Sequence, residues 1–428
     1  MTGVGILAME IYIPKRYVSQ EELEVFDGVS AGKYTIGLGQ KHMSFCGDRE
    51  DTASLALSAV ALLMEKNNIA WNNVGRIDVG TESLIDKSKP IKTYLMSLFG
   101  EHGNHSIEGV DSMAGCYGGT AALFNCINWV ESSSWDGRLA IVVTADIAIY
   151  AAKNARPTGG SGAVAVLVGP QAPLLKEGKL SSTFMDHIFD FYKPNLGEEW
   201  PLVNGALSLQ SYLHALVQCY ITFKAKYLQT TGEELNVRVG STYFCFHAPY
   251  GKLVRKAFAR MYAHDVGFEG EWTKEIETSM VEASHELFRE KVKPSMMISN
   301  EMGNIYCGSL FAGVMSRLSN HEALEENTRL ICFSYGSGCS SSMFSLKWSG
   351  TQALSAFKVA WDLPARLQGR QRVRPDHFEA IQALRSDVYS RPNWNPREDT
   401  DTVPDGAFYL AKVDAQFQRF HQRRDGTS

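Results

Sequence analysis

Cys116 lies in a setting that favours a reactive thiol. It stands in the run Gly115-Cys-Tyr-Gly-Gly-Thr120, directly before an apolar stretch with helical spacing. Free N–H groups at the start of a helix stabilise a thiolate, and flanking glycines let a thioester approach the sulfur while leaving N–H groups for an oxyanion. The expected chemistry is acyl transfer through a thioester on Cys116. A buried structural cysteine beside a glycine turn fits the same residues, and position alone leaves both interpretations open.

Two other polar side chains follow strand-like runs. His247 ends the run Tyr243-Phe-Cys-Phe and precedes Ala-Pro, and Glu82 follows Val79-Gly-Thr. An imidazole at such a strand end can polarise a carbonyl or carry a proton. A carboxyl group in an apolar pocket has a raised pKa, which suits removal of a proton from carbon. A solvated strand-end histidine and an ordinary helix-initiating acid are the competing interpretations.

A cluster of basic residues at helical spacing is a further candidate. Its members are Lys252, Arg255, Lys256 and Arg260. Such a patch can hold a ligand that carries phosphate, but an ordinary solvated helix face is the simpler interpretation of the cluster by itself. A zinc site is not expected, because His285-Glu286 lacks the second histidine of the usual helical zinc motif.

Strands and helices that alternate along the chain must position these residues. Apolar runs rich in β-branched residues predict strands at 4–12, 76–80, 108–111, 138–145, 163–168, 241–246, 296–299, 329–334, 341–348 and 406–413. Helical spacing predicts helices at 53–66 (capped by Asp51-Thr52), 119–133, 252–263, 274–291 and 305–318. This alternation predicts an α/β architecture with parallel or mixed sheets.

The two series of elements also match each other. In each, a strand leads into a turn of small residues and then into an apolar helix, and two later strands flank a glycine-rich stretch, at 158–162 in the first series and 335–338 in the second. This parallel predicts a duplicated half-domain. Cys116 and Asn304 would then face each other across a pseudo-two-fold axis.

Composition excludes several classes of protein. Of 428 residues, 44% are hydrophobic and 21% charged, so wholesale disorder is excluded, and a net charge of −5 gives no general attraction to nucleic acid or to an anionic membrane. Eight scattered cysteines without a C-x-x-C pair are typical of free thiols in a reducing compartment. With no apparent secretory signal or membrane span, we expect a soluble, cytoplasmic protein.

Several long runs resemble the hydroxymethylglutaryl-CoA synthase family, which has the thiolase fold. They include GKYTIGLGQ (32–40), VGTESLIDKSKPIKT (79–93), CYGGTAALFNCINWVESSSWDGR (116–138), NARPTGG (154–160), DFYKPNL (190–196), FHAPYGKLV (246–254) and FSYGSG (333–338). The resemblance covers about residues 4–415. It implies two similar mixed-sheet halves in a layered αβαβα arrangement: an N-terminal half at 1–170 that carries the nucleophile, a connecting helical segment at 171–240 and a C-terminal half at 241–428. It also implies a homodimer.

The resemblance assigns a reaction as well: acetyl-CoA, acetoacetyl-CoA and water would give (3S)-3-hydroxy-3-methylglutaryl-CoA and CoA, with no metal or redox cofactor. Cys116 would carry the acetyl group, Glu82 would remove a methyl proton from it, and His247 would polarise the ketone. Positions matched to substrate or CoA contacts are Ser30, Ala31, Asn154, Thr158, Ser208, Lys252, Lys256, Asn304 and Ser337, the last of which would supply an oxyanion N–H together with the Cys116 backbone. Supporting positions are Asp86, Asp146, Asp190 and Tyr306.

The chain also departs from the family pattern. Ser112-Met-Ala-Gly115 replaces the usual Thr-Thr-Asn-Ala, Cys307 stands where threonine is common, and the stretch after Tyr262 is shorter. These changes keep two alternatives open. One is a paralogue in specialised metabolism that uses another acyl donor or a carrier-bound acceptor, and the other is a non-catalytic protein that binds acyl-CoA. The product would serve mevalonate and sterol-type metabolism or a dedicated pathway.

Overall fold

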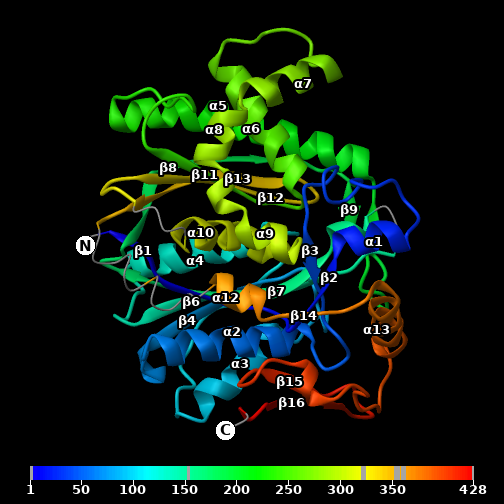
Figure 1. Ribbon diagram of the computed structural model, residues 1–428. Coiled ribbons are helices and arrows are strands. Elements are labelled where there is room, and N and C mark those ends of the chain that lie inside the picture. Colours follow the sequence, from blue (N-terminus) through cyan, green and yellow to red (C-terminus); the bar gives the residue numbers. More distant parts are fainter. Residues whose placement is uncertain (1–2, 152–154, 320–323, 351–356, 358–362, 427–428) are drawn as a thin grey trace.

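The computed structural model describes residues 3–151, 155–319, 324–350, 357 and 363–426 of the chain. Figure 1 shows five alternating layers of helices and strands. From top to bottom these are α5 to α8, then β8, β11, β12 and β13, then α4, α9 and α10, then β1, β4, β6 and β7, and finally α2 and α3. The mixed sheet and its helical layers confirm the predicted αβαβα arrangement.

The strands form one mixed sheet of nine, in the order β11-β12-β13-β8-β1-β7-β6-β4-β5. Its halves meet where the start of β8 pairs with β1, through Gly5↔Leu175 and Ile6↔Leu174. The pairs β11–β12, β4–β6 and β4–β5 are parallel, whereas the remaining neighbours are antiparallel. The nine strands are β1 (Val4–Tyr12), β4 (Val74–Gly80), β5 (Asp111–Ser112), β6 (Leu139–Ala148), β7 (Gly160–Pro170), β8 (Leu174–Met185), β11 (Thr242–Phe246), β12 (Arg329–Gly336) and β13 (Ser340–Trp348).

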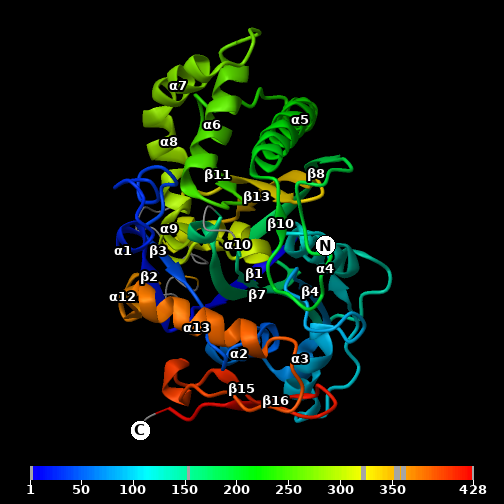
Figure 2. The same cartoon turned by 90° about the vertical axis from the view of Figure 1, so that its right-hand side faces the viewer.

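Helices cover both faces of each half of the sheet, and the remaining strands of the described chain form three separate small sheets. The helices are α1 (Gln20–Phe26), α2 (Thr52–Lys66), α3 (Ile91–Gly100), α4 (Gly118–Glu131), α5 (Gly205–Thr231), α6 (Gly251–Asp265), α7 (Lys274–Ala283), α8 (His285–Lys291), α9 (Met297–Met302), α10 (Ser309–Ser319), α12 (Leu363–Gln368) and α13 (Pro375–Val388). The short strands are β2 (Arg16–Ser19), β3 (His42–Ser44), β9 (Phe191–Tyr192), β10 (Leu202–Val203), β14 (Gln371–Arg372), β15 (Phe408–Val413) and β16 (Arg419–Arg423). Seen from the side, α13 crosses the molecule above the β15–β16 hairpin (Figure 2).

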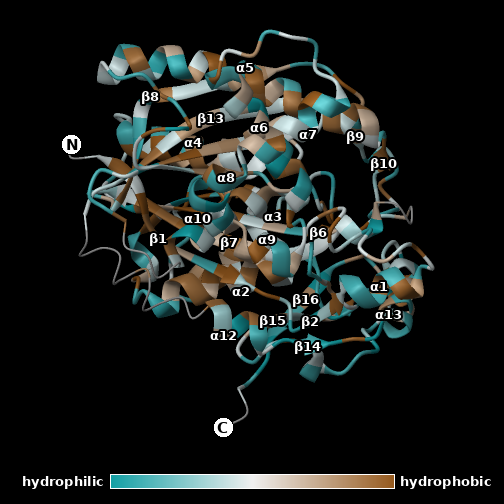
Figure 3. Ribbon diagram, turned by 45° about the horizontal axis from the view of Figure 1, so that its top comes forward, coloured by the Kyte–Doolittle hydropathy of each residue, from teal (hydrophilic) through white to brown (hydrophobic). Residues whose placement is uncertain are grey.

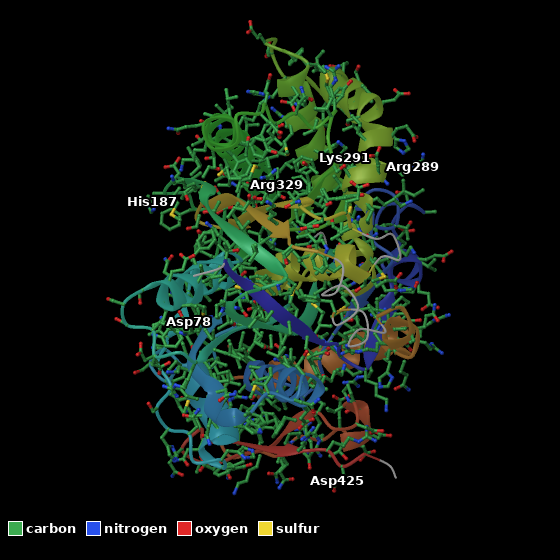
Figure 4. The ribbon with its side chains drawn as sticks, turned by 90° about the vertical axis from the view of Figure 1, so that its left-hand side faces the viewer. Asp78, His187, Arg289, Lys291, Arg329 and Asp425 are labelled. Carbon is green, nitrogen blue, oxygen red and sulfur yellow. The ribbon has the colours of Figure 1, made fainter. Side chains whose placement is uncertain are left out.

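Apolar burial explains why the central layers form. Figure 3 shows β1 mostly brown and β16 mostly teal, in line with a buried central strand and an exposed edge strand. The middle helices α4 and α10 are largely buried between the two halves of the sheet. Some charged side chains on the strands form ion pairs with a side chain of the same strand or of another one. For example, Arg329 of β12, labelled in Figure 4, binds Glu177 of β8 at 2.9 Å, and Asp78 of β4 binds Arg76 at 3.0 Å.

Most of the predicted elements are present near their predicted ends. The cap at Asp51 is confirmed: its carboxylate accepts the Ser54 N–H at 2.8 Å, and the Ser54 hydroxyl oxygen accepts the Asp51 N–H at 2.9 Å. The strand predicted at 296–299 is wrong, because these residues begin helix α9. A short apolar run fits a buried helix as well as a strand, and periodicity alone does not separate the two.

Three other elements differ from the prediction. The strand predicted at 108–111 pairs as a strand only at Asp111–Ser112, and the helix predicted at 274–291 is divided into α7 and α8 at Ser284. Within 171–240, where a helical connection was expected, β8 joins the sheet before α5 begins. The division of the chain at 170 and 240 stays a prediction. Among the described helices, none is long and apolar enough to cross a membrane.

Candidate active site

Cys116 and Glu82 are in direct contact. Cys116 lies in the turn between β5 and α4, and Glu82 lies just beyond the end of β4. Because β4 and β5 are parallel neighbours, the segments that follow them leave the same edge of the sheet. The Cys116 thiol donates to Glu82 Oε1 at a distance of 2.8 Å, and Cys116 is only 9% exposed. A nucleophile and a base are therefore paired without an intervening group.

The environment of Glu82 gives it the protonation behaviour of a base that works near neutral pH. The pKa of its carboxyl group is raised to about 7: burial is the largest cause, the ammonium group of Lys193 opposes it, and the charge of Asp146 adds to the rise. Lys193 also donates to the backbone carbonyl of Glu82 at 3.2 Å, which ties the β9 region to this loop. At pH 7 a large fraction of Glu82 is ionised and able to accept a proton.

The thiol of Cys116 differs from the expectation of a stabilised thiolate. Burial raises the pKa of the thiol well above its ordinary value, and the charge of Glu82 adds to the effect. The N–H groups of Tyr117 and Gly118, at the start of α4, donate to the carbonyls of Ala114 and Gly115 instead of the sulfur. The resting group is therefore the neutral thiol, and Glu82 is placed to take its proton as the sulfur attacks.

Asp146, at the end of β6, connects the two sides of the site. Its Oδ1 accepts hydrogen bonds from the Thr81 hydroxyl, the Glu82 N–H, and the Ser83 N–H and hydroxyl, at 2.9 to 3.1 Å. Its Oδ2 accepts the Cys307 N–H at 3.1 Å. This one buried carboxylate therefore sets the position of the Glu82 loop relative to the turn before α10.

The turn Gly336-Ser337-Gly338 packs against the nucleophile turn. A Cβ on Gly336 would lie 2.2 Å from the carbonyl oxygen of Ala114, so only glycine fits there. A Cβ on Gly115 would lie 2.9 Å from the nitrogen of Ser337, which puts the Ser337 amide beside Cys116. Asp190 holds this turn by accepting the Gly338 N–H at 2.8 Å and the Tyr335 hydroxyl at 3.1 Å.

His247 follows β11, the parallel neighbour of the strand that leads into the Ser337 turn. It is 2% exposed, and its backbone N–H donates to the Phe333 carbonyl at 2.8 Å. Within the described part of the chain, its Nδ1 has no hydrogen-bond partner. Burial lowers the pKa of the imidazole to about 3, so His247 is neutral at pH 7. It can offer an N–H to a carbonyl oxygen without carrying a charge.

A second group of predicted positions surrounds the turn after α1. Ser30 and Ala31 are exposed on this turn. The buried carboxylate of Glu24 holds the turn by accepting three backbone N–H groups, at residues 32, 34 and 35, over 2.7 to 2.8 Å. The Leu38 carbonyl then accepts the N–H of Lys252, at 2.8 Å, so the turn is joined to the start of α6.

The remaining residues predicted to contact substrate or CoA lie in different surroundings. Lys256 is paired with Glu277 at 2.6 Å, whereas Lys252 is exposed. Thr158 and Ser208 are half-buried, in the short turn before β7 and the first turn of α5, and Asn154 lies outside the described residues.

The prediction that Cys116 and Asn304 face each other stays a prediction. The Asn304 side-chain oxygen accepts the Tyr306 N–H and the Ser309 hydroxyl, both at 2.9 Å, and so shapes its own turn. Cys307, in the same turn, contacts the nucleophile turn: its thiol donates to the Gly115 carbonyl at 3.1 Å.

Asp86 does not reach the site. It is exposed, and its carboxylate caps the N–H groups of Ser88 and Lys89, both at 2.7 Å. The predicted spacing of one helical turn from Glu82 does not apply, since residues 82–90 form an irregular loop.

Lys193 and the aromatic side chains around Cys116 were not expected from the sequence. Cys116 clusters with Ala148 and Tyr306, and Tyr150 and Phe191 pack against them. The Lys193 ammonium lies 4.9 Å from the centre of the Tyr306 ring. The run DFYKPNL contained Lys193 without a role, because its charge matters only once folding brings it to Glu82. No group of three or more His, Cys, Asp or Glu in the described chain is arranged to hold a metal ion.

Comparisons with known proteins agree with this geometry. Family models described as hydroxymethylglutaryl-coenzyme A synthase N terminal and C terminal match residues 1–173 and residues 174–271 and 266–424. The cytoplasmic enzyme of Rattus norvegicus is 44% identical over 99% of this chain and 88% of its own length. The mitochondrial enzyme of Homo sapiens is 44% identical over 98% and 89%. A solved structure of MvaS in complex with 3-hydroxy-3-methylglutaryl coenzyme A has a TM-score of 0.88 and 29% identity, and the match covers 99% of this chain and 100% of that one. The chain belongs to the hydroxymethylglutaryl-CoA synthase family of enzymes.

Proposed function

We propose that this protein condenses acetyl-CoA with acetoacetyl-CoA and water to give (3S)-3-hydroxy-3-methylglutaryl-CoA and CoA, through an acetyl group on Cys116. The observation that carries the proposal is the 2.8 Å contact between the Cys116 thiol and the Glu82 carboxylate. Similarity to this family along the whole chain does not favour a different acyl pair or a non-catalytic binding protein.

The first step forms the acetyl-enzyme. Glu82 takes the proton of the Cys116 thiol as the sulfur attacks the carbonyl carbon of acetyl-CoA. The negative charge that develops on the carbonyl oxygen is met by the backbone N–H groups of Ser337 and Cys116, and CoA leaves as the thiol after it receives the proton. Acetylation uncouples Glu82 from the thiol and leaves its carboxylate facing the acetyl group.

The second step makes the carbon–carbon bond. Glu82 removes a proton from the acetyl methyl group, whose acidity is high because sulfur donates weakly into the carbonyl, and the same N–H groups stabilise the enolate oxygen. The neutral His247 imidazole donates a hydrogen bond to the ketone of acetoacetyl-CoA. The methyl carbon attacks that ketone carbon, and the proton held by Glu82 neutralises the new alkoxide.

The last step is hydrolysis. The oxygen of water attacks the thioester carbonyl on Cys116, the C–S bond breaks, and the sulfur regains a proton. All atoms and charges balance among the two thioesters and water, and no carbon is oxidised or reduced overall. We therefore propose a reaction without a metal or a redox cofactor.

The experiment that tests the proposal separates acetylation from condensation. Intact mass spectrometry of the protein with acetyl-CoA is expected to show a single added acetyl group, and Cys116→Ala is expected to abolish it. Addition of acetoacetyl-CoA is then expected to release hydroxymethylglutaryl-CoA. Acetylation without condensation would favour the altered-substrate alternative, and absence of acetylation would favour the binding protein.

We also propose a cytosolic homodimer that supplies mevalonate and sterol-type metabolism. The cytoplasmic relative supports this location, although an equally similar relative is mitochondrial. Light scattering of the purified protein and fractionation of cells that express it are the direct tests.

A further inference from the structure

The proposed reaction has a problem of access in its last step. After condensation, one end of the product is a thioester on Cys116 and the other end is still joined to CoA. The route that admits the thioester arm is therefore occupied at the moment when water has to reach Cys116. A second route for water would remove this conflict.

The structure contains a cavity that fits this need. It has a volume of about 470 Å³, and its inner end is formed by Glu82, Gly115 and Ser337. From there it extends between the loop after Glu82 and the segment after β9, towards Arg385 and Tyr389 of α13. Since about 10–15 Å³ of accessible volume holds one water molecule, a chain of water molecules fits easily.

All but one of the described positions matched to substrate or CoA contacts lie outside the cavity lining. Among those that the structure describes, Ser337 lines the cavity, whereas the exposed turn at Ser30 and Ala31 and the start of α6 at Lys252 do not. Those residues instead adjoin one another through the hydrogen bond between Leu38 and Lys252. The cavity therefore reaches the nucleophile turn from a side that the expected CoA contacts at Ser30, Ala31 and Lys252 do not line.

The walls of the cavity are mostly apolar but carry several charged groups, and they are held in place. Charged groups face it from Lys193, Glu199 and Arg385, and Glu199 binds Arg385 at 2.6 Å. The loop after Glu82 is anchored twice: the Thr52 hydroxyl donates to the Ser83 carbonyl at 2.7 Å, and the Tyr389 hydroxyl donates to the Leu84 carbonyl at 3.1 Å. The charged groups give water molecules hydrogen-bond partners inside a cavity whose remaining walls are apolar.

We propose that this cavity, which ends at Glu82, is the route by which water reaches the thioester on Cys116, separately from the route of the CoA arm. The inference rests on the proposed function. Glu82, at the inner end, takes one proton from the arriving water, and the water oxygen bonds to the thioester carbonyl carbon. The C–S bond then breaks, the carboxylic acid forms, and the proton passes to the sulfur.

The test narrows the cavity without touching the reacting groups. Leu196 lines the cavity and is 51% exposed, so Leu196→Trp adds bulk at little risk to folding. Leu84→Trp, combined with it, adds bulk nearer to Glu82. The matched control is Leu228→Trp, on a leucine of α5 that is 52% exposed and does not line the cavity.

Each variant is mixed with both thioesters, quenched at set times and weighed intact. We expect acetylation and condensation within twofold of the unsubstituted protein in all variants. We expect the covalent adduct that joins Cys116 to hydroxymethylglutaryl-CoA to decay at least tenfold more slowly in the double variant, less so in Leu196→Trp, and normally in Leu228→Trp.

Two results would overturn the inference. Normal decay of the adduct in the double variant would show that water arrives elsewhere, and slowed acetylation to the same degree as slowed decay would show that the thioester itself uses this cavity. Failure of the unsubstituted protein to acetylate at all is a different outcome, because it would remove the proposed function on which the inference rests.

Discussion

Replacement of Asp146 by asparagine tests what the negative charge of this one carboxylate contributes to the site. Asn keeps the shape of the side chain and an oxygen that can accept the four hydrogen bonds now made to Oδ1. Its amide nitrogen replaces Oδ2, however, and then faces the Cys307 N–H, which donates to Oδ2 at 3.1 Å. One hydrogen bond to a charged group is lost and two donors oppose each other, so we expect Asp146→Asn to lower the free energy of unfolding by about 2–3 kcal/mol.

The same change is expected to move the pH dependence of catalysis. The negative charge of Asp146 contributes to the raised pKa of Glu82, which is about 7. Proton removal needs the Glu82 carboxylate, so the rate rises with pH through that pKa. Because Asp146→Asn removes a like charge, the pKa of Glu82 falls and the rising limb moves to lower pH.

The assay is the exchange of acetyl methyl protons with D2O in the acetyl-enzyme, followed by mass spectrometry from pH 5 to 9. The control is Asp265→Asn on α6, since the side chain of Asp265 is also buried and accepts the Tyr220 hydroxyl at 2.6 Å and the Val237 N–H at 2.7 Å. We expect the control to lose stability without a shift of the pH profile. If the rising limb of the pH profile of Asp146→Asn stays at the same pH or moves to higher pH, the electrostatic argument is refuted.

Three further substitutions separate the roles of other groups. Glu82→Gln removes the base that takes a proton first from the Cys116 thiol and then from the acetyl methyl group, so we expect acetylation and condensation both to fall about 10²–10⁴-fold, measured in single turnovers; normal acetylation would contradict the role of Glu82 in the first step. Asp190→Asn weakens the support of the Ser337 turn, so acetylation and condensation are both expected to slow about 10²-fold, and an effect on only one step would argue against a shared oxyanion site. Glu24→Gln loosens the turn after α1, so steady-state kinetics are expected to show a higher KM for the acyl-CoA, with kcat within about twofold; an unchanged KM would separate this turn from CoA binding.

Local sequence predicted the elements whose pattern is long and regular. The apolar runs of β1, β6 and β7 and the capped helix α2 needed no tertiary information, because each has a single consistent period and a clear start. The run at 296–299 failed because four residues carry no usable period, and burial in the middle layer stabilised a helix there. The strand β8 was missed because it gains its neighbours only when the two halves of the sheet meet.

The active site was also predictable only in part from the sequence. The chain itself carried the types of its reactive groups: a thiol in a glycine turn, an acid after one strand and an imidazole after another. Only the fold decided their protonation, because a pKa depends on burial and on charges that are distant in sequence. Packing turned the expected thiolate at Cys116 into a neutral thiol, brought Lys193 to Glu82 and brought the Cys307 thiol to the Gly115 carbonyl. Residue type can be read along a chain, whereas dielectric surroundings and neighbours exist only in three dimensions.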